Sequence, residues 1–110
     1  MNEDKAGLPV IAFADAAAFE AWLGDQPRTA PGVWLKFAKA GNTASALTKS
    51  DAVDSALAYG WIDGQLDKYD ADWSLTRFTP RRPKGKWSAV NVKRAEALIA
   101  NGRMTAAGLA

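Results

Sequence analysis

Apolar residues recur at helical spacing in three segments of the chain, each preceded by a residue suited to cap a helix N-terminus. The capping residues are Asp15, Ser50 and Ser88. Gly60 and Gly102 lie where the second and third helices should end. The pattern predicts helices over residues 15–24, 51–59 and 88–101, with buried faces made by Phe19, Trp22 and Leu23; by Val53, Ala56 and Leu57; and by Val92, Ala95, Leu98 and Ile99.

Shorter apolar segments between these helices have the length and alternation of strands. In the segment 33–39, Val33, Leu35 and Phe37 should face one side, and Trp34, Lys36 and Ala38 the other. The order β-α-β-α-β-β-α predicts an α+β domain, a small and mostly antiparallel sheet with about three helices packed against it. We expect one domain over residues 1–110, with strands at 8–13, 33–39, 61–66 and 74–79.

Composition narrows the classes of function. The chain has no cysteine and no histidine, the side chains that most often hold metal ions, and histidine is the usual general base at neutral pH. We therefore expect no metal site and no cofactor. The chain has no apolar run long enough to span a membrane and no basic-then-apolar leader, so a cytoplasmic protein is expected.

The charges divide unevenly along the chain. Residues 1–76 carry 6 basic and 11 acidic side chains, whereas residues 77–110 carry 8 basic and 1 acidic side chain. The two parts can attract each other within the fold, or the basic part can form an anion-binding face. The sequence leaves both interpretations open.

The segment from Arg77 to Pro83 is the strongest candidate for a binding site. It reads Arg-Phe-Thr-Pro-Arg-Arg-Pro, with Arg81 and Arg82 between two prolines that stiffen the backbone. Arginine offers a planar fork of donors that suits carboxylate or phosphate. Three arginines within six positions therefore predict recognition of an anion.

Residues on both sides of this segment can contribute to the same site. Ser88 and Asn91 lie at the start of the third helix, where free amide groups favour anions. Asp63 can pair with one of the arginines to fix the hairpin, or it can line a cleft and orient a ligand. With the neighbouring aromatic side chains, the predicted ligand-binding residues are Trp61, Asp63, Arg77, Arg81, Arg82, Trp87, Ser88 and Asn91.

Three motifs together resemble the bacterial YdeI/OmpD-associated family. They are Gly60-Trp61-Ile62-Asp63-Gly64, Arg77-Phe78-Thr79-Pro80-Arg81-Arg82-Pro83 and Trp87-Ser88-Ala89-Val90-Asn91. The resemblance covers most of the chain and is strongest from about residue 56 to residue 109. It implies a link to bacteriocin protection and to tolerance of antimicrobial peptides and stress. Relatives continue into a further helical region, so the resemblance also implies that residues 1–110 are the N-terminal part of a longer chain.

These observations favour a non-enzymatic binding domain that recognises an anionic group on a small molecule or an acidic protein surface. No residue is assigned a catalytic role. One alternative is an enzyme on a small anionic substrate, with Asp63 as base and the arginines stabilising charge. Another is weak binding of single-stranded nucleic acid by interleaved aromatic and basic residues. Nucleic acid is the less favoured partner, because the net charge is only +2 and no binding motif for it is present.

Overall fold

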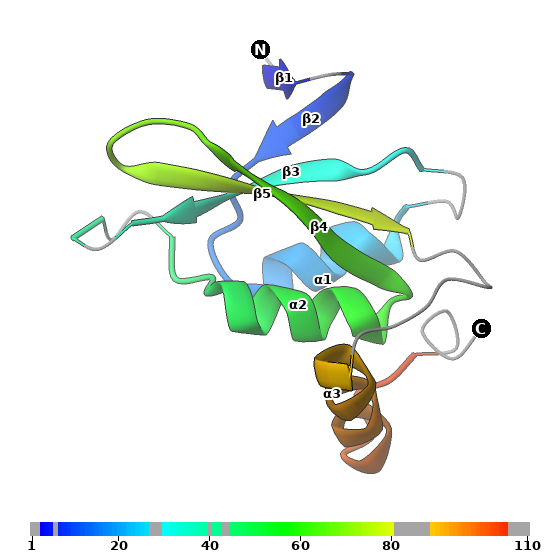
Figure 1. The fold of residues 1–110 in the computed structure, drawn as a ribbon. Helices are drawn as coiled ribbons and strands as arrows, with labels where there is room; N and C mark the ends of the chain where they lie inside the picture. The colour runs from blue at the N-terminus through cyan, green and yellow to red at the C-terminus, as the bar shows by residue number, and fades with distance from the viewer. Residues whose placement is uncertain are drawn as a thin grey trace.

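One five-stranded sheet carries the helices on one side (Figure 1). The computed structural model describes residues 3–5, 7–26, 30–39, 41–42, 45–80 and 89–105. Its elements in chain order are β1 (Glu3–Lys5), β2 (Leu8–Ile11), α1 (Ala16–Gly24), β3 (Val33–Ala38), α2 (Lys49–Ala58), β4 (Trp61–Lys68), β5 (Trp73–Pro80) and α3 (Ala89–Ala100). The strands lie in the order β1-β2-β3-β5-β4. Neighbouring strands are antiparallel, except that β2 and β3 run parallel.

The structure confirms the α+β class and every predicted helix and strand, with boundaries within two residues. The predicted order is wrong at the N-terminus, where β1 precedes β2. The three residues of β1 are charged, so only their pairing with β2 makes them a strand. The sheet is also mixed, whereas a mostly antiparallel sheet was expected. Helix α1 connects β2 to β3 and returns the chain to the same end of the sheet, which makes this pair parallel.

Local capping explains where the helices begin and end. Asp15 caps α1 as predicted, since its carboxylate accepts a hydrogen bond from the Ala18 amide. The cap of α2 is Thr48, whose Oγ1 accepts from the Asp51 amide, and the predicted cap Ser50 lies inside the helix. Gly60 and Gly102 follow α2 and α3 with φ angles of +81° and +77°, which glycine adopts without strain. The predicted cap of α3, Ser88, lies outside the described residues.

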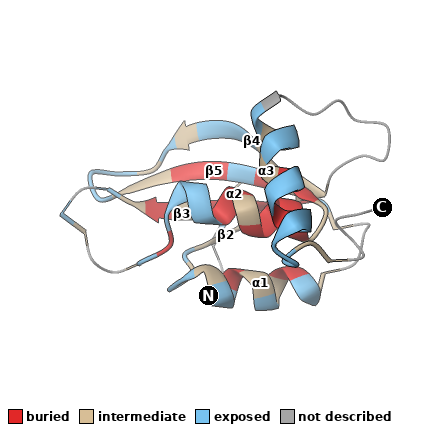
Figure 2. Ribbon diagram, turned by 90° about the horizontal axis from the view of Figure 1, so that it is seen from below, coloured by how far each residue is buried: buried red, intermediate tan, exposed pale blue. Residues whose placement is uncertain are grey.

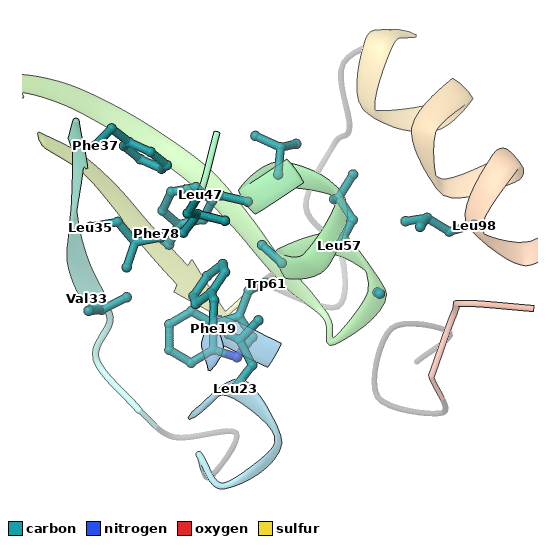
Figure 3. Close-up of a cluster of buried hydrophobic side chains, with 14 residues drawn as sticks. Phe19, Leu23, Val33, Leu35, Phe37, Leu47, Leu57, Trp61, Phe78 and Leu98 are labelled. Atoms are coloured by element: carbon teal, nitrogen blue, oxygen red, sulfur yellow. The ribbon is translucent and has the colours of Figure 1, made fainter. Parts of the chain in front are cut away.

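The main core lies between the sheet and helices α1 and α2. Alternate residues of β3 point into it, as predicted, and Phe78 of β5 lies beside them. Phe19 of α1 meets the Phe78 ring edge-on, with 5.7 Å between the ring centroids. Figure 3 shows side chains from β3, β5, α1 and α2 converging on this layer, among them Val33, Leu35, Phe37, Leu23 and Leu57.

Helix α3 packs mainly on α2 rather than on the sheet (Figure 1). Ala95 and Leu98 are buried against α2, as predicted. The prediction that Val92 and Ile99 share this buried face is wrong, because their exposed fractions are 39% and 54%. The outer side of α3 is largely exposed in Figure 2. Because α3 packs mainly on one helix, only a narrow stripe of its surface is buried, and Val92 and Ile99 lie outside that stripe.

A second, smaller core lies on the sheet face that carries no helix. Trp34 of β3 is only 3% exposed there, between Leu8 of β2 and Leu75 of β5. Lys5 on the edge strand β1 forms an ion pair with Asp67 on the opposite edge strand β4, at 2.8 Å. A flat five-stranded sheet would keep its edges too far apart for this contact, so the sheet is curled around Trp34.

Trp22 was expected in the core with Leu98, and the two residues differ. Leu98 is buried, whereas Trp22 is half-buried and packs against the margin of the main core.

Leu98→Ala should lower the free energy of unfolding by about 2–5 kcal/mol, because it leaves a cavity between α2 and α3. Ile99→Ala is the matched control and should cost under about 0.5 kcal/mol. Urea denaturation measures both, and equal losses would contradict the assigned face of α3.

Gly32 approaches its neighbours too closely for any side chain. A Cβ there would lie 2.9 Å from the Phe78 carbonyl oxygen, and the φ angle is +134°. Gly32→Ala should therefore cost at least about 2 kcal/mol, from backbone strain and overpacking together. Gly41→Ala separates the two causes, since Gly41 also has a positive φ but no neighbour within 4 Å of a Cβ. Thermal unfolding of the two variants should show the larger loss for Gly32→Ala.

The pair between Lys5 and Asp67 makes stability depend on pH. The hydrogen bond from Lys5 lowers the pKa of Asp67 below its ordinary value of 3.8, and the Lys68 amide acts in the same direction. A lowered pKa stabilises the fold above the unfolded value and loses that effect as pH falls through the folded value. Asp67→Asn should therefore be less stable than the parent at pH 7, and the difference should shrink below about pH 4. Urea denaturation at pH 7 and pH 3 tests this, and an unchanged difference would refute it.

Candidate functional site

The predicted ligand-binding residues are divided between described and undescribed parts of the chain. Trp61, Asp63, Arg77 and Asn91 are described. The other four, Arg81, Arg82, Trp87 and Ser88, lie outside the described residues, so their roles stay predictions.

Trp61 and Asp63 do not converge with Arg77 as the sequence suggested. Asp63 pairs with Phe78 in the β4–β5 ladder, so its side chain leaves the sheet on the helix side. Arg77 is the next residue along β5 and therefore points to the opposite face, where it lies across from Trp34. Trp61 is 4% exposed and meets Trp22 edge-on in the main core. The sheet thus separates Arg77 from Asp63, and a direct pair between these two is excluded.

Asn91 lies in the first turn of α3 and is half-buried. That position agrees with the predicted helix start. Its predicted partners at the start of α3, Ser88 and Trp87, fall in the undescribed segment 81–88. The ligand-binding role of Asn91 therefore stays a prediction.

The face opposite the helices carries cations beside aromatic rings. We call it the cationic sheet face, and it consists of Lys5, Lys36 and Arg77 with Trp34, Tyr69 and Trp73. The pairing register explains the grouping, since Arg77 lies across from Trp34 and Lys36 follows Trp34 by two residues. Lys5 reaches the same place from β1, with its Nζ 5.4 Å from the centre of the Trp34 ring.

The three cations of this face are held to different degrees. Lys5 is paired with Asp67, which offsets its charge. Lys36 holds its Nζ 4.2 Å from the centre of the Tyr69 ring and 4.8 Å from that of Trp73, so its charge is positioned without a carboxylate. Arg77 is exposed, and it forms no ion pair with any described residue. Lys36 and Arg77 therefore keep their positive charge available to a ligand.

Trp34 contributes shape rather than a donor to this face. Its indole Nε1 is buried and has no hydrogen-bond partner within the described structure. An unpaired buried N–H costs about 1–3 kcal/mol. Burial of the ring under Leu8 and Leu75 offsets that cost, and it fixes the surface on which Lys5 and Arg77 lie.

Sequence reasoning missed most of this face. Arg77 is the one member shared with the predicted site residues, which did not include Lys5, Trp34, Lys36, Tyr69 or Trp73. Alternation along 33–39 placed Trp34 and Lys36 on one side, which was the available signal. The β3–β5 register that adds Arg77 to them is a tertiary fact.

Ion pairs explain part of the uneven charge distribution. Arg94 in α3 binds Asp54 in α2 at 2.9 Å, and Arg103 lies 3.6 Å from Glu20 in α1. Both pairs connect the basic C-terminal part with the acidic N-terminal part. Attraction within the fold therefore accounts for part of the uneven charge distribution. Arg77 takes part in neither pair.

Two further kinds of feature, a cluster of metal-binding side chains and a membrane-spanning helix, are absent from the described part of the chain. It contains no group of three or more His, Cys, Asp or Glu residues that could hold a metal ion. Among the helices described, none is long and apolar enough to cross a membrane.

Comparison with known proteins places the chain in a family. The family model described as "Domain of unknown function (DUF8412)" matches residues 11–110. No curated protein and no solved structure matches the chain. The likeness to the YdeI/OmpD-associated family is not tested by these comparisons and stays a prediction. Since the match extends over nearly the whole sequence, the chain belongs to the DUF8412 family.

Proposed function

We propose that this protein is a non-enzymatic domain that binds an anionic group through the cationic sheet face. The observation that carries the proposal is Arg77, which is exposed on this face and forms no ion pair with the described residues. A guanidinium can make two parallel hydrogen bonds to a carboxylate or a phosphate. Lys36, fixed over Tyr69 and Trp73, adds a second charge with little rotamer freedom left to lose.

The arrangement favours an anionic group over single-stranded nucleic acid. Bases bind to proteins of that kind by stacking on free aromatic faces. On this face Trp34 is buried, and one face of each of Tyr69 and Trp73 is contacted by Lys36. Few ring surfaces remain for bases, whereas the charges remain available to an oxyanion.

The arrangement also weakens the enzyme alternative. That alternative combined Asp63 as a base with the arginines as stabilisers of developing charge. A base and its electrostatic partner must both reach the reacting atoms. Asp63 and Arg77 leave the sheet on opposite faces, so Arg77 cannot serve a reaction at Asp63.

The partner is a small anionic molecule or an acidic patch of another protein. Both present carboxylate or phosphate oxygens to Arg77. Arg81 and Arg82, which follow β5 in sequence, lie outside the described residues, and their role in binding the anion stays a prediction. The link to bacteriocin tolerance rests on the resemblance of the three motifs alone, and it is proposed on that basis.

Inorganic phosphate should shift the amide resonances of β3 and β5 in an NMR titration. Arg77→Ala should weaken this binding at least about tenfold, because charge-assisted hydrogen bonds worth about 1.5–3 kcal/mol are lost. Arg77→Lys should recover part of the affinity, because it keeps the charge without the fork of donors. Raising the salt concentration should weaken binding, as it does for exposed charges.

Lys68→Ala is the matched control for this experiment. It removes one exposed cation from the neighbouring strand β4, and the Lys68 side chain points to the helix side, as its partner Ser74 does. Lys68→Ala should leave the phosphate affinity nearly unchanged. Equal losses for Arg77→Ala and Lys68→Ala would reduce the effect to net charge and overturn the assigned face.

A further inference from the structure

A cleft of about 280 Å³ is lined by one residue of α2, by residues of α3 and by the chain that follows α3. Helix α2 covers the sheet face opposite the cationic one, so the cleft lies away from the cationic sheet face. Ala97 and Leu98 of α3 form its apolar part. Its polar lining comes from Asp54, Lys93, Arg94, Asn101 and Arg103. The volume is just below the range of sites for drug-sized ligands, so the cleft suits a small molecule.

Donors outnumber acceptors in the lining of this cleft. Lys93, Arg94 and Arg103 carry only donors, and the one carboxylate, Asp54, already accepts from Arg94 Nη1. Asn101 uses its Oδ1 to accept from the Arg103 amide, which leaves its side-chain NH₂ as a donor. A ligand with hydrogen-bond acceptors, such as carboxylate or phosphate oxygens, can therefore bond to the donors that line this cleft.

The donors belong to a fixed framework. Arg94 is held by Asp54 and by the carbonyl and hydroxyl oxygens of Ser50, which joins α3 to the start of α2. At the other end, the amide of Thr105 donates to the Ala58 carbonyl at 2.9 Å and ties the chain after α3 to the end of α2. The backbone is therefore anchored on both sides of the cleft, and the ordering that a ligand requires falls on the side chains of Lys93 and Arg103.

Arg103 is the cation best able to turn toward a ligand. Its guanidinium lies 3.6 Å from Glu20, too far for a hydrogen bond, while Glu20 accepts from Ser55 Oγ at 2.9 Å. Its backbone is fixed, since the Arg103 amide donates to the Leu98 carbonyl at 2.9 Å. The carbonyl oxygens of Leu98 and Ala97 both accept hydrogen bonds from backbone amides. The C-terminal end of α3 therefore repels an anion less strongly than a helix end with free carbonyl groups would.

We propose that this cleft binds a small oxyanion, a carboxylate or a phosphate, that carries a compact apolar group. The oxyanion lies beside Asn101 and Arg103, and the apolar group lies against Ala97 and Leu98. Lys93, about two helical turns from Asn101, adds positive charge at the other end of the cleft. Arg94 holds the cleft open through Asp54 and adds its remaining donors. The site is separate from the cationic sheet face, so either proposal can fail without the other.

The test is an NMR titration of the intact chain with two probes. Benzoate has an oxyanion and an apolar ring, whereas inorganic phosphate has the oxyanion alone. Benzoate should shift amides of α2, α3 and residues 101–105, and it should bind there at least about tenfold more tightly than phosphate. No shift in these segments with either probe would overturn the site, and equal affinities would overturn the apolar part of the proposal.

Variants separate this cleft from the sheet face. Lys93→Ala and Arg103→Ala should each weaken several-fold the benzoate affinity that is read from the amides of α2, α3 and residues 101–105. Arg77→Ala, which removes the anion contact of the sheet face, should leave the affinity read from these cleft amides unchanged. Lys93 forms no ion pair with the described residues, so Lys93→Ala tests the site without disturbing the fold even if Arg103→Ala is destabilised. Retained affinity in Lys93→Ala, with the fold intact by circular dichroism, would refute the role of the lysine in the cleft. Loss of the shifts of the cleft amides in Arg77→Ala would place the anion on the sheet face instead.

Discussion

Burial of β3 on both faces is the constraint on which the other layers depend. This strand lies in the middle of the sheet, with Val33, Leu35 and Phe37 against the helices and Trp34 against the second core. Hydrophobic alternation alone would leave one face in water. Because the second face is also covered, the sheet must curl until Lys5 meets Asp67. The same curl brings cations from separate strands together around one indole ring.

The intramolecular charge pairs determine which cations remain for a ligand. Arg94 is paired with Asp54 and Lys5 with Asp67, so the charges of these two cations are offset within the fold. Exposed pairs of this kind each contribute little to stability, but they direct side chains. Outside these two pairs lie Arg77 and Lys36 on the sheet face and Lys93 at the α2–α3 cleft, where the guanidinium of Arg103 is 3.6 Å from Glu20. The net charge of +2 thus conceals two local excesses of positive charge on opposite sides of the molecule.

The carboxylates described in the two proposed sites are held by cations, Asp67 by Lys5 and Asp54 by Arg94. Catalysis of proton transfer requires an acid and a base that both reach the reacting atoms. The one acid that the sequence offered for that role, Asp63, is separated from Arg77 by the sheet. Binding, by contrast, requires only that donors be held in place, and the ion pair Arg94–Asp54 and the rings around Lys36 do this.

The sequence by itself determined the helices, the strands and the alternation along β3, because capping residues and hydrophobic periodicity act over a few residues. It also marked Arg77 as a candidate ligand contact. Tertiary structure decided that β1 joins the sheet, that β2 and β3 run parallel, and that α3 packs on α2 with Val92 and Ile99 outside. It also decided that Arg77 and Asp63 lie on opposite faces. A shift of one residue in strand register reverses every side chain, and register depends on distant strands that local patterns do not specify.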